Sequence, residues 1–315
     1  MRSPKTSQFR RRVRLRANPA LMLLALAAAV VLVLRPGPGR AASLDDYLAI
    51  SEDQELALGK ELAQQVQKKL PMLYDAAIVS YVNRLGQRMA QASARPNLVY
   101  TFRVVDVAEP NAFALPGGHV FVQRGLLDTV STEMELAGVL AHEVGHVAGR
   151  HGAKQVGRLR LLEAGAGLLS EVLGGKPAQG QGQGQGQGNQ PDLTQLAINL
   201  LASGVLLKYS REQEHEADDL GFTTMVRAGY DPRGLILFFQ MLLARRQENP
   251  NAFEQLFATH PPSRDRIQAL SARWWAERPP NLQVDSEEFR RMRAHLATLP
   301  PPKPMPKDPP QSPRR

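Results

Sequence analysis

Two segments near the start of the chain, residues 51–70 and 75–94, carry apolar side chains at the spacing of one helix face. Ser51 and Gln54 form a capping pattern that opens the first segment, and Pro71 closes it. Both segments are therefore predicted to be amphipathic helices.

The period of the apolar positions changes to that of strands after residue 99. Tyr100, Phe102 and Val104 alternate with more polar neighbours, which predicts a half-buried strand. Residues 113–115 and 120–122 flank a Pro-Gly-Gly sequence, which predicts a hairpin. A small sheet thus accompanies the helices.

Helical periodicity returns at Thr132, which forms a capping-box pattern with Glu135. The helix that follows is apolar along most of its length, and two later segments repeat this pattern. The apolar positions are Leu136, Val139, Leu140 and Val147, then Leu235, Phe238, Phe239 and Leu242, and finally Ile267, Leu270 and Trp274. These positions are predicted to pack the helical half of the protein.

Two further apolar stretches, residues 159–173 and 193–207, are separated by a glutamine-glycine run. The run lies in a predicted flexible insertion, residues 177–191, because its composition supports no core. The second stretch is too short to cross a bilayer, so we interpret it as a buried helix. The alternative is a membrane-surface or lid element.

The charge of the chain is concentrated at its start. Residues 1–41 hold nine of the 39 basic side chains and no acidic one. The rest of the chain therefore has equal numbers of basic and acidic side chains, and its charge does not indicate nucleic-acid binding. An arginine-rich start, the apolar run 20–34 and the small residues that end at Ala41 predict a signal peptide. An uncleaved membrane anchor at 20–34 is the alternative.

Composition bounds the rest of the chain. It contains no cysteine, so its stability comes from a core rather than from disulfides. Residues 42–280 are long enough for one core and are predicted to be the catalytic domain. Residues 281–315 are predicted to be a C-terminal extension, with a disordered proline-rich tail beyond Pro300.

The sequence His142-Glu143-Val144-Gly145-His146 lies inside the helix that begins after Thr132. Residues four apart lie one turn above each other, so both imidazoles reach one tetrahedral ion while Glu143 faces the water beside it. This spacing is typical of zinc hydrolases. A core helix with two satisfied histidines is the alternative, and the further motifs below favour the metal site.

A third ligand separates the classes of these enzymes. His151 is one residue short of the metzincin pattern, and on a continuing helix its ring would point about 140° away from His146, so we interpret it as structural. Glu214 and Asp218, four apart on another predicted helix, fit better. Glu214 would be an anionic ligand, and Asp218 would orient a ligating imidazole. Taken alone, such an acidic helical run is usually a solvated face.

Four ordered motifs across about residues 50–275 resemble the Ste-type and Oma-type zinc endopeptidases. The first is Asn-Ala-Phe-Ala-Leu-Pro-Gly-Gly at 111–118, and the second is Glu-Leu-Ala-Gly-Val-Leu-Ala at 135–141, which leads into the histidine motif. The third is Ser-Arg at 210–211 before Glu214, with Ala-Asp at 217–218 after it. The last is Ala-Gly-Tyr-Asp-Pro at 228–232, followed by Thr-His-Pro-Pro at 259–262. The resemblance is to the periplasmic quality-control branch, without the tetratricopeptide array that some of its members carry.

The resemblance implies a mostly helical α+β zincin-like fold, with a small sheet that edges the active-site cleft. An exposed edge beside the zinc would bind substrate backbone by strand addition, and a hairpin that serves only as scaffold is the alternative. It also implies one Zn²⁺ ion per chain, with His142, His146 and Glu214 as ligands and Glu143 as the catalytic base. Asp218 would lie behind the ligands. The lipidated substrates of multi-spanning members are not expected, because at most one segment here is apolar enough to span a membrane.

The predicted function is a zinc-dependent endopeptidase that is exported to the periplasm and cleaves misfolded or misassembled envelope proteins. Its predicted partners are unfolded substrates and the envelope membrane or outer-membrane assembly machinery. A non-catalytic holdase is one alternative, which an intact Glu143 argues against. A mitochondrial Oma-like stress protease is the other, and the uninterrupted apolar core of the leader favours export.

His260 is the last candidate of the site. The rigid Pro261-Pro262 that follows it would fix its direction, and the matching histidine of the resembling family approaches the zinc site. A neutral imidazole there either covers the open position of the metal or assists catalysis by stabilising the oxyanion. We favour the cover, and an inert loop histidine is the alternative.

Overall fold

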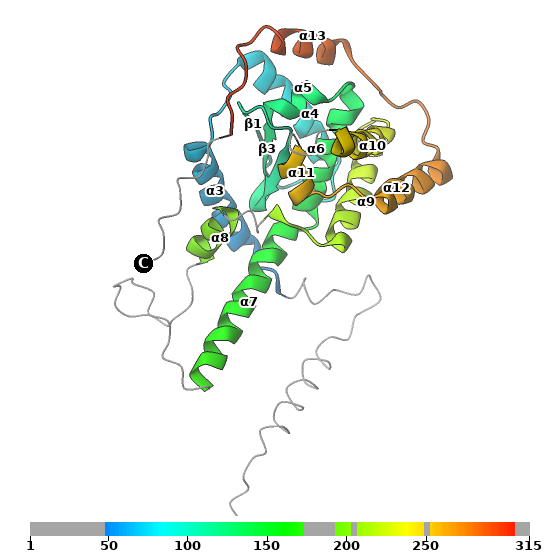
Figure 1. The fold of residues 1–315 in the computed structure, drawn as a ribbon. Coiled ribbons are helices and arrows are strands. Elements are labelled where there is room, and N and C mark those ends of the chain that lie inside the picture. The colour runs from blue at the N-terminus through cyan, green and yellow to red at the C-terminus, as the bar shows by residue number, and fades with distance from the viewer. Residues whose placement is uncertain (1–47, 173–192, 203–206, 249–252, 306–315) are drawn as a thin grey trace, which may run out of the picture. The chain divides into compact units, whose positions relative to one another are not determined.

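Helices make up most of the computed structural model, which describes residues 48–172, 193–202, 207–248 and 253–305 (Figure 1). The order is α3 (Glu52–Lys69), α4 (Ala76–Ala92), β1 (Thr101–Val105), β2 (Ala112–Leu115), the 3₁₀ turn η1 (Pro116–Gly118), β3 (His119–Gln123), α5 (Arg124–Thr129), α6 (Glu133–Ala148), α7 (His151–Val172), α8 (Leu193–Ala202), α9 (Arg211–Arg227), α10 (Arg233–Glu248), α11 (Glu254–Thr259), α12 (Arg264–Glu277) and α13 (Glu287–Leu296). This is the predicted α+β zincin-like class.

The sheet has the strand order β1-β3-β2, with β1 parallel and β2 antiparallel to the central β3. The predicted hairpin is confirmed, because β2 and β3 pair across η1 with Ala112 opposite Val122. Gly117 lies in this turn at φ 74°, a conformation that costs a side-chain-bearing residue energy. The turn leaves β2 at an edge of the described sheet.

Alternating side chains of the sheet fill two apolar layers. Val120 and Val122 face the larger layer, which contains α4, α6, α10 and α13, whereas Phe121 faces a smaller layer with α3 and parts of α7 and α8. This alternation follows from the two-residue period of a strand. The sheet is therefore covered on both faces, and all four residues of β2 are buried.

Helix α6 contacts the sheet through β2 and packs most extensively on α9 (Figure 1). The close approach depends on Gly145, because a Cβ atom there would lie 2.6 Å from the carbonyl oxygen of Ala217 on α9. Gly221 of α9 in turn lies against the backbone of His142. The two helices that carry the motifs are thus held at nearly backbone contact.

Predicted helix starts are largely confirmed. Ser51 and Gln54 form the reciprocal capping box at α3. At α6 the carboxylate of Glu135 accepts hydrogen bonds from the backbone N–H groups of Ser131 and Thr132. Local capping of this kind needs no tertiary contact, which is why it was readable from sequence.

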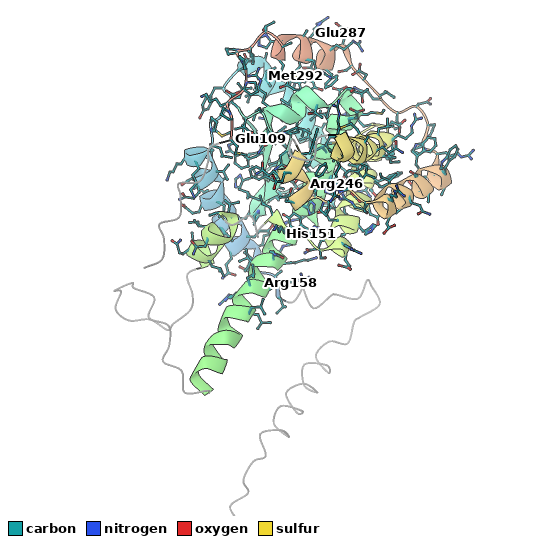
Figure 2. All side chains as sticks on the ribbon, viewed as in Figure 1. Glu109, His151, Arg158, Arg246, Glu287 and Met292 are labelled. Carbon is teal, nitrogen blue, oxygen red and sulfur yellow. The ribbon has the colours of Figure 1, made fainter. Side chains whose placement is uncertain are left out.

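Helix α13 belongs to the same core as the catalytic domain. Its buried residues Phe289, Met292 and Leu296 join the larger apolar layer, and the helix contacts α4 and α5 (Figure 2 labels Met292). The residues on either side of position 280, where the predicted extension begins, consequently pack into one core, and α13 of the extension completes it.

Residues 300–305 lie against α5 and the segment that follows β1. Lys303 pairs in parallel with Val107, and the Arg124 guanidinium donates a 2.6 Å hydrogen bond to the carbonyl oxygen of Pro300. The prediction of disorder beyond Pro300 is therefore wrong for this stretch, because proline carbonyls still accept hydrogen bonds and Lys303 supplies an N–H. Residues 306–315 lie outside the described residues.

Three other predictions fall outside the described residues: the signal peptide at 1–41, the anchor at 20–34 and the insertion at 177–191. The apolar stretch 193–207 forms α8 over its first part, and Ala197 is buried in the smaller apolar layer. On α7, Leu161 and Leu162 are exposed. Among the described residues, no helix combines the length and the apolar character needed to cross a bilayer.

Candidate metal centre

His142 and His146 lie on one face of α6, one turn apart. Their Nε2 atoms are 3.0 Å apart, and the two rings meet at 90°. Two unprotonated ring nitrogens at this distance repel each other unless a proton or a cation lies between them. The geometry therefore suits a shared cation.

Glu214 enters from the first turn of α9, which Ser210 caps. Its Oε2 is 3.5 Å from Nε2 of His142, and its Oε1 is 3.5 Å from Nε2 of His146. Burial disfavours its charge, yet His260, His142 and His146 hold the pKa of Glu214 well below its usual range. The carboxylate is thus an anion in this site.

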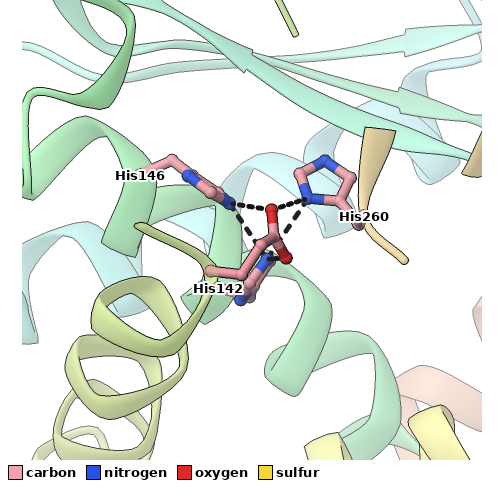
Figure 3. Close-up of side chains that lie close together, drawn as sticks. His142, His146 and His260 are labelled. Atoms are coloured by element: carbon pink, nitrogen blue, oxygen red, sulfur yellow. Dashed lines mark hydrogen bonds and ion pairs between the residues drawn. The ribbon is translucent and has the colours of Figure 1, made fainter. Parts of the chain in front are cut away.

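His260 follows α11 and points its Nδ1 into the same space (Figure 3). That atom is 3.1 Å from Oε1 of Glu214 and 3.4 Å from Nε2 of His142. The donor atoms of His142, His146, Glu214 and His260 all lie within 4.8 Å of one another. The structure hence brings the three predicted ligands and His260 together.

The donor set fits a tetrahedral zinc ion. Donors about 2.0–2.1 Å from such an ion are about 3.3–3.5 Å apart. The five separations given above range from 3.0 to 3.5 Å. Two imidazoles with a carboxylate are also a ligand set that zinc hydrolases use. None of the four residues is more than 3% exposed.

Glu143 stands beside this cluster rather than in it. Its Oε1 is 3.5 Å from Nε2 of His260, and its buried Oε2 has no hydrogen-bond partner among the described residues. A free carboxylate oxygen next to a metal centre can accept a proton from water. This is the position that a general base requires.

Asp218 lies behind His142, where the sequence predicted an orienting acceptor. Its Oδ1 is 3.0 Å from Nδ1 of His142. Burial opposes a charged ring, but Asp218 and Glu214 outweigh it and raise the pKa of His142 to about 9. The same carboxylates that attract a proton to this ring favour a cation among the donors.

Sequence reasoning missed Arg266, which holds the acidic residues in place. Its guanidinium donates two 2.6 Å hydrogen bonds to the carboxylate of Asp218 and lies 2.6 Å from Oε2 of Glu214. Burial would raise the pKa of Asp218, but Arg266 keeps it below its ordinary value. Arg266 stands among charged residues on the first turn of α12, so its sequence context looks exposed although the residue is buried.

Tyr209 was also missed. Its ring stacks on that of His146, with centroids 3.9 Å apart and an interplanar angle of 21°. A cavity of about 10 Å³ separates Tyr209 and His146 from Ala114, Leu115 and Pro116 at the end of β2. The edge strand therefore runs beside the candidate metal centre, as the family resemblance implied.

His151 lies outside the donor cluster, in agreement with its interpretation as structural. The orientation predicted for its ring assumed that one helix continues from His146 to His151. The structure shows that it does not. Helix α6 ends at Ala148, α7 begins at His151, and Nδ1 of His151 is 2.8 Å from Nδ1 of His146. The residue consequently touches a candidate ligand from behind.

The sequence of the chain is similar to those of known peptidases. The sequence model of peptidase family M48 matches residues 78–274. A beta-barrel assembly-enhancing protease of Yersinia pestis is 28% identical over 78% of this chain and 49% of its own length. The mitochondrial metalloendopeptidase OMA1 of Schizosaccharomyces pombe is 32% identical over 71% of this chain and 65% of its own.

The metalloprotease YcaL of Escherichia coli is 29% identical over 62% of this chain and 72% of its own length. The matched region of the family contains His142, Glu143, His146, Glu214 and His260. The chain spans about half the length of the barrel assembly-enhancing relatives that it matches.

Proposed function

This chain belongs to peptidase family M48, and we propose that it is a zinc-dependent endopeptidase in which His142, His146 and Glu214 hold the metal. The observation that carries the proposal is the buried cluster of four donor atoms within 4.8 Å, with Glu143 beside it, whose Oε2 has no hydrogen-bond partner among the described residues. When bound, zinc supplies Lewis acidity that polarises a peptide carbonyl and acidifies water.

The residues of the chain perform the proton transfers. Glu143 takes a proton from the attacking water and later gives it to the leaving amine. The carboxylate of Asp218, 3.0 Å from Nδ1 of His142, fixes the ring of that histidine, and Arg266 fixes Asp218 in turn. Glu143 needs a free oxygen in this scheme, and the role is supported by its Oε2, which has no hydrogen-bond partner among the described residues.

Substrate backbone is proposed to add to the sheet at β2. This strand is an edge of the described sheet, and its end lies across a small cavity from His146. Main-chain hydrogen bonds to an edge strand accept many sequences but require an extended segment. An unfolded protein supplies such segments, whereas a folded one seldom does.

His260 is proposed to cover the metal until substrate arrives. Its Nδ1 lies within the donor set, and Pro261-Pro262 follow it directly. A second cavity of about 10 Å³ is lined by His142, Glu143 and His260 and is otherwise apolar. Each cavity holds about one water molecule, so a peptide enters only if a covering residue moves.

The biological role proposed here is removal of misfolded or misassembled proteins of the cell envelope, after export to the periplasm. The support is similarity to proteases named for beta-barrel assembly, together with the arginine-rich leader. A reporter enzyme that works only after export, fused to residues 1–41 in a bacterial host, tests the location. Failure of that fusion to show activity would favour the mitochondrial alternative.

The central experiment is digestion of casein by the purified chain with and without a metal chelator, compared with Glu143→Gln. We expect the chelator to stop cleavage, and Glu143→Gln to stop it while zinc content and folding stay unchanged, because Glu143 is a base and not a ligand. Cleavage by Glu143→Gln at the wild-type rate would refute the mechanism. Binding of unfolded casein without cleavage by the wild-type chain would support the holdase.

A further inference from the structure

We propose that His151 and Glu216 are positioning residues for the metal ligand His146, a step that rests on the proposed zinc function. Together they form a hydrogen-bonded chain that approaches His146 from the side opposite the metal. Figure 2 labels His151 at the start of α7, where this helix leaves the rest of the peptidase unit. The ring of His151 is fully buried.

A break in the helix brings His151 to this place. Arg150, between α6 and α7, has φ 56°, a left-handed conformation that costs a non-glycine residue about 1–2 kcal/mol. Its side chain lies 2.8 Å from Oε2 of the buried Glu55 and donates a 2.6 Å hydrogen bond to the carbonyl oxygen of Ile50. The surrounding structure therefore maintains the turn that places the next residue, His151, beneath His146.

Gly149 provides the space for the ring. A Cβ atom at this position would lie 2.5 Å from Nε2 of His151 and 2.9 Å from its Cε1. Gly149 itself has φ −74°, which any residue adopts, so backbone freedom does not explain the glycine here. The three atoms that a Cβ atom at Gly149 would approach most closely all belong to the ring of His151.

The hydrogen-bond chain has one consistent set of proton positions. When Nε2 of His146 binds a metal, its proton resides on Nδ1, which lies 2.8 Å from Nδ1 of His151. His151 must then accept at Nδ1 and carry its own proton on Nε2. That nitrogen is 3.3 Å from Oε2 of Glu216, an acceptor. Every proton in the chain thus has an acceptor.

The arrangement matches the one behind the other imidazole ligand. His142 faces Asp218 directly, and His146 faces Glu216 through His151. Both carboxylates belong to α9, which also supplies Glu214. One helix consequently provides an anionic ligand and the two acceptors that orient the histidines of α6. Partners of this kind typically contribute about 10–100-fold to metal affinity.

His151 is not itself placed to bind the metal. Its Nδ1 contacts the nitrogen of His146 that points away from the donor cluster, and its Nε2 contacts Glu216. It is also absent from the set of described donor atoms within 4.8 Å. Its function is therefore exerted through His146.

The test measures zinc affinity of the full chain by competition with a chelator. His151→Leu fills the space without offering an acceptor, and we expect it to raise the zinc Kd by about 10–100-fold. His151→Asn places an amide oxygen near the position of Nδ1, so it should recover part of that loss. Glu216→Gln should weaken binding less than His151→Leu, and Glu212→Gln, exposed on the same helix, should not change it.

Two further measurements separate positioning from packing. Thermal unfolding in excess chelator should be similar for His151→Leu and His151→Asn, although their zinc affinities differ. In the zinc-loaded protein, the Nδ1 proton of His146 should give a slowly exchanging NMR signal in the wild type and in His151→Asn, and lose it in His151→Leu.

Wild-type zinc affinity in folded His151→Leu would overturn the inference and leave the proposed function intact. If His151→Leu does not fold, equal affinities of wild type, His151→Asn and Glu216→Gln would overturn it instead. A wild-type chain that holds no zinc would overturn the proposed function and this inference together. Loss of affinity in the order given above supports it.

Discussion

The guanidinium of Arg266 donates two parallel hydrogen bonds of 2.6 Å to the carboxylate of Asp218. The two residues are 48 positions apart in the sequence, and both are buried. A third nitrogen of the same group contacts Glu214. A bidentate pair of this kind fixes direction as well as distance. The link between α9 and α12 thereby sets the orientation of His142, although Arg266 does not touch that ring.

Replacement of Arg266 by methionine should destabilise the fold by about 3–5 kcal/mol, because it leaves buried carboxylates without a compensating charge. Urea unfolding at saturating zinc measures the loss. Arg264→Met, exposed on the same helix, is the matched control and should change stability by less than about 0.5 kcal/mol.

The double variant Arg266→Met with Asp218→Asn should lose less than the sum of the two single variants, because the pair acts as a unit. Strict additivity would show that the two residues do not interact in solution. Arg266→Lys should also reduce zinc affinity, since an ammonium group cannot reproduce the two parallel hydrogen bonds.

Addition of one methyl group in the histidine motif, Gly145→Ala, should push α9 away from α6. The new Cβ atom would lie 2.6 Å from the carbonyl oxygen of Ala217, a backbone atom that cannot rotate aside. We expect a loss of about 1–3 kcal/mol from overpacking, and weaker zinc binding because Glu214 moves with α9.

Metal analysis after dialysis gives the zinc content of Gly145→Ala. Gly221→Ala is a graded comparison, because its Cβ atom would be 3.2 Å from the nearest backbone atom and should be tolerated better. An equal loss in both variants would argue that helix separation is not the cause.

His260→Ala should raise the rate of casein cleavage if the imidazole covers the metal, because its Nδ1 would no longer compete with water and substrate for the donor space. A fall of about 100-fold or more would instead identify His260 as an electrophile that stabilises the oxyanion. An unchanged rate would make it inert. Zinc content must be measured in parallel, because loss of a fourth donor also weakens metal binding.

The imidazole of His119 should make stability depend on pH. Burial, assisted by the charge of Arg103, lowers the pKa of His119 to about 4 from 6.5. Between these values the unfolded chain binds a proton that the folded chain does not, so the free energy of unfolding should fall as the pH drops from 6.5 to 4. His119→Asn, which keeps an acceptor near Oγ1 of Thr101, should show a flatter profile.

Urea titrations of both proteins at pH 7 and pH 4.5 test this prediction by the difference between them. Other groups titrate identically in the two chains, so their contributions cancel. A wild-type profile that is no steeper than that of His119→Asn would contradict a lowered pKa at this position.

Much of the site was readable because its signals are local. The spacing of His142 and His146 on an apolar helix, and of Glu214 and Asp218 on another, depends only on the period of the α-helix. The hairpin was likewise predictable from a Pro-Gly-Gly sequence between apolar runs. In each case the interacting residues are neighbours along the chain.

The remaining features depend on tertiary contacts. Arg266 reads as a surface residue until α9 supplies Asp218. A glycine, Gly149, precedes the turn, but the left-handed residue is Arg150 itself, and Glu55, 95 residues away, holds that strained conformation. His151 was therefore oriented wrongly from sequence by assuming that the helix continued. The proline-rich end was misjudged for the same reason, since the pairing of Lys303 with Val107 is non-local.

The position of α13 and residues 300–305 in the core has a consequence for synthesis. The ribosome makes the chain from its N-terminus, and domains fold as their residues emerge. The apolar faces of α4 and α5 then lack their packing partners until Phe289, Met292 and Leu296 have been synthesised. Val107 likewise lacks its backbone partner until Lys303 has been synthesised. The core of the nascent protease should thus remain incompletely packed until nearly all described residues are made. The order of translation would itself delay the onset of proteolysis.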